Sequence, residues 1–143
     1  MIHILSIGVS TPGFLAKKQL KELLRELIQK EGKTCGDISL VFTDDEYLLE
    51  VNKQFLDHDY YTDVITFDYC VDTTISGDVM ISLDRVKDNA SGLNITFQEE
   101  LQRVIFHGVL HLCGYKDKSS DDVVLMRRKE NEWIEAFVSR GTN

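Results

Sequence analysis

Two of the four histidines stand four residues apart in the segment HGVLHLCGYKD, residues 107–117. Four residues of an α-helix span about 400° of rotation, so His107 and His111 would lie about 40° apart on one face and one turn apart along the axis. Both imidazoles could then reach one cation. The spacing therefore predicts the first two ligands of a metal site.

Asp117 can supply a third ligand, but only if the chain reverses after the helix. A helix that continued beyond His111 would carry residue 117 about 9 Å further along its axis. Gly114 can form a left-handed C-cap at little cost, and this turn would bring Asp117 back beside the imidazoles. Three protein ligands leave a tetrahedral zinc ion one open position, which is the pattern of a catalytic site that activates water near neutral pH.

The histidine pair also has other interpretations. Two unrelated histidines on a partly buried helix face would show the same spacing. A zincin-type protease has glutamate directly after its first metal histidine, whereas this chain has Gly108, so a peptidase is disfavoured. Two histidines and a carboxylate also describe non-haem iron oxygenase sites, but the strand pattern shows no β-sandwich to carry one.

Several residues near these ligands could assist the chemistry. Glu130 falls in an apolar helical row, where it could orient a ligand imidazole or accept a proton, or could be a rim residue or an ion-pair partner. Lys116 and Lys118 flank Asp117 and could hold a phosphodiester, or could be ordinary solvated lysines. Other basic residues that could line an RNA path are Arg85, Lys87, Arg103, Arg127 and Arg128.

Hydrophobic periodicity predicts the elements that must position these side chains. Strands are predicted near residues 2–7, 38–42, 63–69 and 77–83. Helices are predicted from Ser10, Thr11 and Pro12 to Gly32, after the caps Thr43 and Asp44, briefly at 84–90, after the capping box of Thr96 and Glu99, and from Ser119 and Ser120 onward. The last helix is expected to turn inward Val123, Met126, Trp133, Ile134 and Phe137. This order indicates one α/β domain, residues 1–143, with a small mixed sheet backed by helices.

Composition limits the class of protein. The 143 residues are 43% hydrophobic, enough for one core, and no apolar run approaches the roughly 18 residues of a membrane span. The N-terminus shows no cleavable signal and the cysteines number three, so a cytoplasmic protein with reduced thiols is expected. The net charge is −8, and residues 37–79 carry one basic and eleven acidic side chains. An RNA partner would therefore have to avoid this middle segment.

Over most of its length the chain resembles the YbeY endoribonucleases, also called rRNA maturation factors. The matching segments are VNKQF at 51–55, TDVITF at 62–67, GDVMIS at 77–82, HGVLHLCGYKD at 107–117, and Met126 with Glu130. The resemblance implies an α/β metallohydrolase fold, with a mostly parallel four-stranded sheet and about five helices. It further implies one Zn²⁺ or another divalent transition metal per chain, and cleavage of single-stranded RNA. The implied role is small-subunit (16S) rRNA maturation and ribosome quality control, with the small ribosomal subunit or its proteins as partners.

Two positions depart from the family pattern. The third ligand is usually a histidine preceded by aspartate, whereas this chain has Lys116 and Asp117, and aspartate is also a zinc ligand. Family members usually carry an active-site arginine where this chain has Leu56, and His58 or Lys53 could replace it. The expected metal ligands are His107, His111 and Asp117, and the expected catalytic residues are Glu130, His58 and Lys116. The departures leave two alternatives: a non-catalytic, metal-stabilised ribosome-assembly or RNA-binding factor, and a small-molecule hydrolase.

Overall fold

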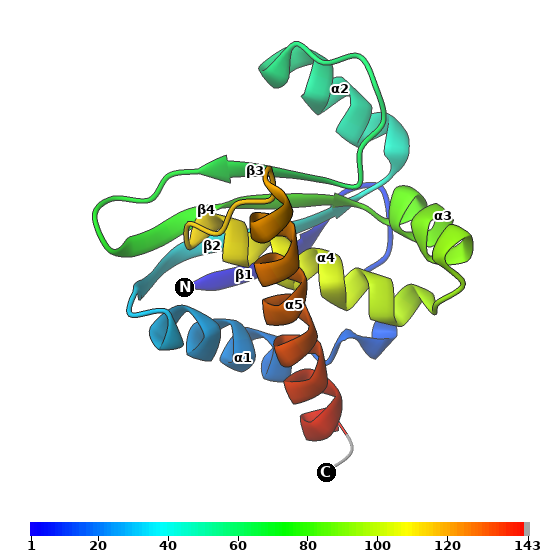
Figure 1. The fold of residues 1–143 in the computed structure, drawn as a ribbon. Coiled ribbons are helices and arrows are strands. Elements are labelled where there is room, and N and C mark those ends of the chain that lie inside the picture. The colour runs from blue at the N-terminus through cyan, green and yellow to red at the C-terminus, as the bar shows by residue number, and fades with distance from the viewer. Residues whose placement is uncertain (142–143) are drawn as a thin grey trace.

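The computed structural model describes residues 1–141, which form a four-stranded sheet and five α-helices (Figure 1). The strands are β1 (Ile2–Ser6), β2 (Thr34–Thr43), β3 (Val64–Asp68) and β4 (Thr74–Ser82), in the spatial order β1-β2-β4-β3. β1, β2 and β4 are parallel, and β3 runs antiparallel to β4. The mixed, mostly parallel α/β sheet expected from the sequence is therefore confirmed.

The helices are α1 (Lys17–Lys30), α2 (Asp45–Leu56), α3 (Leu83–Leu93), α4 (Phe97–Leu112) and α5 (Ser120–Gly141). Two predicted N-caps are present: the Asp44 side chain accepts from the backbone N–H of Tyr47 at 2.8 Å, and Thr96 Oγ1 accepts from that of Glu99 at 3.1 Å. Each cap satisfies a donor that a helix start otherwise leaves unpaired. α3 is longer than the one or two turns predicted for 84–90. Within residues 1–141, no helix combines the length and apolarity needed to cross a bilayer.

The predicted start of the first helix was wrong. Residues Gly13–Leu15 form a separate 3-10 turn, Ala16 has a left-handed φ of 48°, and α1 begins only at Lys17. Thr11 does not cap a helix, because its hydroxyl hydrogen-bonds that of Ser6. The extra turn places Leu15 in the core, where it is 1% exposed. Burial of this side chain thus overrides the local Ser-Thr-Pro signal.

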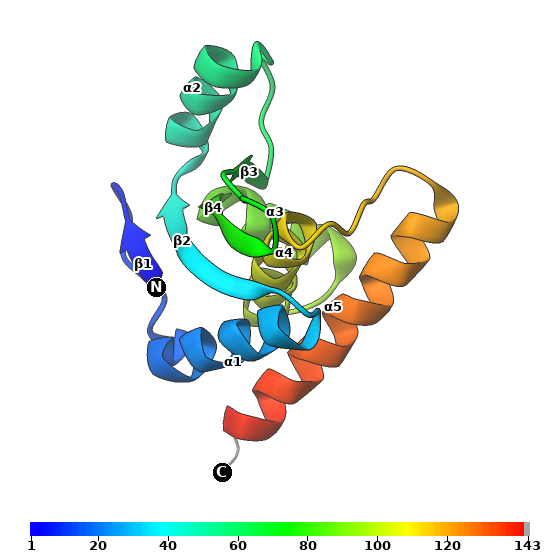
Figure 2. The same cartoon turned by 90° about the vertical axis from the view of Figure 1, so that its left-hand side faces the viewer.

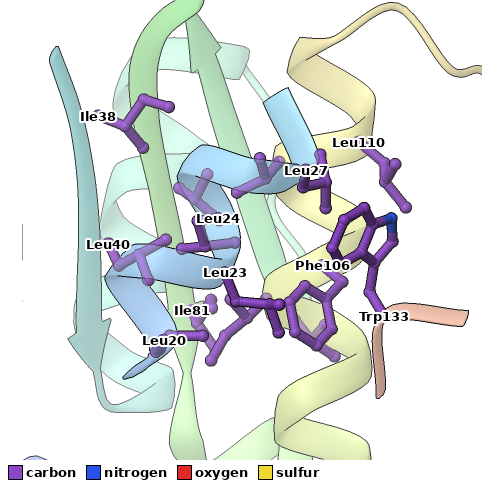
Figure 3. Close-up of a cluster of buried hydrophobic side chains, with 14 of the residues drawn as sticks. Leu20, Leu23, Leu24, Leu27, Ile38, Leu40, Ile81, Phe106, Leu110 and Trp133 are labelled. Carbon is purple, nitrogen blue, oxygen red and sulfur yellow. The ribbon is translucent and has the colours of Figure 1, made fainter. Parts of the chain in front are cut away.

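The main core lies between the sheet and the layer formed by α1, α4 and α5 (Figure 3). α1 contributes a leucine stripe, which meets Phe106 and Leu110 of α4 and Trp133 of α5. Within that stripe the fully buried residues are Leu20, Leu23, Leu24 and Leu27. On the last helix, Met126, Trp133 and Phe137 face inward as predicted, and Ile134 is partly buried. Val123 is an exception, because it is 47% exposed on the first turn of α5.

Gly108 sets how closely α4 approaches the sheet. A Cβ atom at this position would lie 2.5 Å from Cγ1 of Val79 on β4, closer than real Cβ contacts allow. The glycine that argued against a zincin-type protease therefore has a packing role of its own. A glutamate at position 108 would have no room between the helix and the sheet.

Replacing Gly108 with alanine should destabilise the fold by about 2 kcal/mol, because overpacking a core contact typically costs that much. Urea unfolding followed by circular dichroism would measure the change. Gly92→Ala is the matched control, since Gly92 lies on α3 with no atom within 4 Å of the place that an added Cβ would take. We expect Gly92→Ala to raise stability by up to about 1 kcal/mol. Equal stability of the Gly108→Ala variant and the original chain would contradict the close packing.

α2 lies on the other side of the sheet from α1 and α5 (Figures 1 and 2). It packs through a small second cluster, in which Leu48 and Val51 meet Ile65 of β3. Arg85 of α3 forms an ion pair with the start of α2, where its guanidinium lies 2.7 Å from the carboxylate of Asp45. The segment that leaves α2 then runs to β3, the edge strand next to the histidine-bearing end of α4.

Candidate metal and nuclease site

The paired histidines lie on α4 with their rings parallel. The ring centroids of His107 and His111 are 6.4 Å apart and their planes differ by 4°. This is the arrangement that a four-residue helical spacing predicts. Both side chains line a hollow of about 170 Å³ together with Asp117 and with Val64 and Thr66 of β3.

Each imidazole is oriented through its Nδ1 atom. Nδ1 of His107 lies 2.8 Å from Oε2 of Glu130, and Nδ1 of His111 lies 3.0 Å from the backbone oxygen of Tyr115. Both partners are acceptors, so each Nδ1–H donates, and in a neutral imidazole Nε2 then carries the lone pair. This pattern is the one that zinc-binding histidines show, with the distal nitrogen left to bind the metal.

The chain reverses after α4 at the predicted glycine. Gly114 has a φ of 109°, its N–H donates to the oxygen of His111 at 3.0 Å, and the N–H of Tyr115 donates to that of Leu110 at 3.1 Å. These two hydrogen bonds define a Schellman motif. The turn is also tied to α1, because the Tyr115 hydroxyl donates to Oε1 of Glu31 at 2.6 Å. The carbonyl that orients His111 therefore belongs to a rigid reversal.

Asp117 returns to the histidines as the reversal predicts. Its Oδ2 lies 3.4 Å from Nε2 of His107. Two ligands bound at about 2.0–2.1 Å to a tetrahedral zinc ion lie roughly 3.3 Å from each other. The His107–Asp117 pair thus has the separation of two zinc ligands, and the donor types fit this metal.

The three-ligand cage is not closed as the side chains stand. Within residues 1–141, no group of three or more His, Cys, Asp or Glu side chains is placed to hold a metal ion. His111 shares the hollow with the other two side chains and is exposed to solvent. The metal ligands assigned from the sequence therefore remain a prediction, supported by donor chemistry and by the spacing of one pair.

Glu130 is a buried residue and not a rim residue. It is 4% exposed, and its Oε1 also accepts from Nη1 of Arg103 at 3.2 Å. Its hydrogen bond raises the pKa of His107 against the opposing effect of burial. Glu130 contacts Nδ1, whereas a metal would bind at Nε2, so its position fits orientation of His107. The catalytic role expected of Glu130 stays a prediction.

A second hollow, of about 280 Å³, opens beside His107 and Asp117. Arg103 and Arg127 line it together with Glu100. Burial raises the pKa of Glu100, which is 6% exposed and whose Oε1 has no hydrogen-bond partner. Sequence reasoning missed Glu100, although it lies seven residues before His107 and hence on the same helix face.

The remaining candidates lie away from these hollows. Lys116 lines a separate hollow with Tyr115 and Asp122. It lines none of the three hollows that contain His107, so its position does not support a catalytic role, which stays a prediction. The other basic candidates outside the site are occupied or simply exposed. Arg85 pairs with Asp45 and Asp88, Lys87 lies over the ring of Phe97, Lys53 pairs with Glu50 and Asp59, and Lys118 and Arg128 are exposed.

His58 lies on the segment between α2 and β3. It lines a hollow of about 220 Å³ with Leu56, Tyr60, Val64 and others, and no described contact joins it to the histidine pair. Asn52 holds this segment, because its Nδ2 donates to the backbone oxygen of Tyr60 at 2.9 Å. A catalytic role for His58 therefore also stays a prediction.

Comparisons with known proteins agree on one family. The family model for endoribonuclease YbeY matches residues 9–138. An endoribonuclease YbeY from Porphyromonas gingivalis is 49% identical over 131 residues, which cover 92% of this chain and 86% of the relative. Another from Flavobacterium johnsoniae is 53% identical over 114 residues, which cover 80% and 82%.

A solved structure has a similar fold. The solution structure of a Thermotoga maritima protein superposes with a TM-score of 0.70 at 30% sequence identity, and the match covers 98% of this chain and 91% of the other. The segments that carry the histidines, the glycine turn and Glu130 all lie inside the matched residues. The chain therefore belongs to the YbeY family of endoribonucleases.

Proposed function

We propose that this protein is a metal-dependent endoribonuclease that cleaves single-stranded RNA. The observation that carries the proposal is the geometry around His107. One of its nitrogens is held by Glu130, and the other faces the carboxylate of Asp117 at 3.4 Å. Family membership supports the endoribonuclease activity, whereas metal dependence rests on this donor set.

The site residues would divide the work between binding and charge neutralisation. His107, His111 and Asp117 would hold a zinc ion or another divalent transition metal. When bound, such an ion supplies charge that polarises a phosphate oxygen and makes water acidic enough to attack near neutral pH. Arg127 is exposed and lines the adjoining hollow, where its guanidinium could pair with the phosphate and offset charge that develops during cleavage. Arg103 lines the same hollow but is already paired with Glu100 and Glu130.

The biological substrate we propose is ribosomal RNA of the small subunit, cleaved during its maturation and quality control in the cytoplasm. This part of the proposal rests on the family alone. A partner protein of the small subunit would be consistent with a chain whose net charge of −8 gives it little bulk attraction for RNA.

Cleavage of end-labelled RNA tests the proposal directly. Protein purified without an affinity tag should contain about one transition-metal ion per chain, and it should cut a single-stranded RNA internally. A duplex of the same sequence should be resistant. A chelator should stop cleavage, and added Zn²⁺ or Mn²⁺ should restore it. Repeated purification without any transition metal, combined with undiminished cleavage in chelator, would rule out the metal-dependent mechanism.

The second candidate is a metal-stabilised factor that binds RNA or a ribosomal protein without cutting it. Leu56 favours this candidate, because it stands where family members usually carry arginine and is 40% exposed beside an uncharged part of the groove. Lys53 does not replace the arginine, since it pairs with Glu50 and Asp59. Metal removal that lowers the melting temperature in a protein that never cuts RNA would identify this role.

A further inference from the structure

His58 and Tyr60 form an exposed stacked pair on the segment between α2 and β3. Their ring centroids are 5.1 Å apart, their planes differ by 20°, and the Tyr60 hydroxyl lies 3.0 Å from Nδ1 of His58. Tyr60 is 55% exposed, and His58 is exposed as well. Two aromatic rings held against each other and exposed in this way leave ring surface accessible to a ligand.

The pair is held in place from beneath by one buried side chain. Asn52 is 2% exposed, and its side-chain amide donates to the backbone oxygen of Tyr60 at 2.9 Å. The backbone oxygen of Asn52 accepts from the N–H of His58 at 3.1 Å. A segment anchored in this way offers a preorganised surface, so a ligand that stacks on it loses little free energy in ordering it.

The stacked pair also lies on the same groove as the histidine site. The hollow that His58 and Tyr60 line includes Val64 and Thr66 of β3. The same two β3 residues line the hollow that contains His107, His111 and Asp117. Figure 1 shows β3 as the edge strand between the α2 segment and the end of α4. A strand of RNA placed at the metal ligands would therefore meet the aromatic pair next.

Charge indicates which part of the RNA would face this pair. His58 is flanked by Asp57 and Asp59, within a stretch of residues 37–79 that carries one basic and eleven acidic side chains. Phosphates would be repelled there. Arg103 and Arg127 lie instead in another hollow that His107 lines, together with the carboxylates of Asp63, Glu100, Asp117 and Glu130. Among the residues that the structure describes, those that line the hollow at His58 and Tyr60 include no lysine or arginine. This end of the groove thus suits an uncharged base better than a phosphate.

We propose that His58 and Tyr60 form a stacking platform for a nucleobase of the single-stranded RNA, beside the phosphodiester at the histidine site. The assignment rests on the proposed function and adds how the substrate is held. Every base has a π-face, so this contact would favour unpaired RNA without demanding a sequence. It also gives His58 a substrate-binding role in place of a catalytic one.

Equilibrium binding of a fluorescein-labelled single-stranded RNA tests the platform. Titrations of the full chain in chelator keep the RNA intact, which a gel can verify, and anisotropy reports affinity. Tyr60→Ala should weaken binding about tenfold or more, whereas Tyr60→Phe, which keeps the ring, should bind nearly as well as the original chain. Tyr69→Ala is the matched control, because Tyr69 is 59% exposed but lies outside the groove. Thermal unfolding confirms that each variant is folded.

Two further readouts separate stacking from charge. Tyr60→Ala should leave the slope of log affinity against log salt unchanged, whereas Arg127→Ala should reduce that slope by about 0.7. A series of RNAs would each carry one abasic position, placed at a different point along the oligonucleotide. At one of these points the abasic site should weaken binding to the original chain, and Tyr60→Ala should not weaken it further. This loss of additivity is the signature of a direct base contact.

The platform is overturned if Tyr60→Ala binds RNA as tightly as the Tyr69→Ala control, or if its effect is equally large at every abasic position. The first result would also be expected if the pair served a protein partner. Because binding is measured without cleavage, failure of the platform differs from failure of the proposed nuclease. A chain that stacks RNA but never cuts it would retain the platform and lose the enzyme.

Discussion

Alanine at position 107 is expected to slow RNA cleavage about a thousandfold or more and to remove stoichiometric metal from the protein. His107 is the side chain that joins the two parts of the site, with Nδ1 on Glu130 and Nε2 facing Asp117. A catalytic metal ion contributes several kcal/mol to transition-state stabilisation, and each 1.36 kcal/mol corresponds to a factor of ten in rate. Single-turnover cleavage and elemental analysis of the purified variant would measure both effects.

His3→Ala is the matched control for this variant. His3 is exposed on β1, the opposite edge strand of the sheet from β3, so its loss should leave both metal content and cleavage unchanged. Alanine is a strong helix former, and we expect α4 to persist in the His107→Ala variant, as circular dichroism can show. Full metal content and an unchanged rate in that variant would refute the assignment of the site.

Removal of the Glu130 side chain by alanine should lower metal affinity by about 10- to 100-fold. Glu130 is not one of the expected metal ligands, but it holds the ring of His107 through a 2.8 Å hydrogen bond at Nδ1. Partners that orient a ligand imidazole in this way typically contribute that much. Glu130→Gln should lose less affinity, because its amide oxygen can still accept from Nδ1. A metal titration followed by competition with a chelator would give the metal affinities of the original chain, Glu130→Ala and Glu130→Gln.

The Glu130 variants distinguish a positioning role from a purely structural one. Saturating metal should restore much of the cleavage rate in Glu130→Gln, which a general loss of folding would not allow. Glu132→Gln is the control on the same helix, since Glu132 is exposed and pairs only with Lys129 among its described contacts, at 3.8 Å. Metal affinity in Glu130→Ala equal to that of this control would show that the carboxylate does not orient His107.

Local signals in the sequence were enough to predict much of the geometry of residues 107–117. The four-residue spacing fixes the relative positions of His107 and His111, because both lie on one helix whose geometry is nearly constant. The reversal at Gly114 was predictable for a similar reason, since a positive φ there favours glycine and the hydrogen bonds that close the turn lie within six residues. The return of Asp117 to His107 follows from these two local features.

The same local signals failed where burial decided the outcome. The Ser-Thr-Pro sequence predicted a helix start, yet Leu15 reaches the core only because a 3-10 turn and a left-handed Ala16 precede α1. Val123 matches the apolar period of α5 but is exposed, because the first turn of that helix extends beyond the core. Apolar spacing shows which residues could be buried, whereas neighbouring elements determine which ones are.

Contacts between α4 and α5 were decided by tertiary structure alone. Glu130 and His107 are 23 residues apart, and the sequence left open whether the carboxylate was a rim residue or a ligand partner. Lys116 lies beside Asp117 in sequence but faces another hollow, and His58 reaches the groove only through the path of the segment between α2 and β3. The sequence alone determined the relative positions of His107, His111 and Asp117, because one helix and one turn specify them. The distances between separate elements depend on how the whole core packs, so only the folded structure could show where Glu130, Arg103 and the His58–Tyr60 pair lie relative to the expected metal ligands.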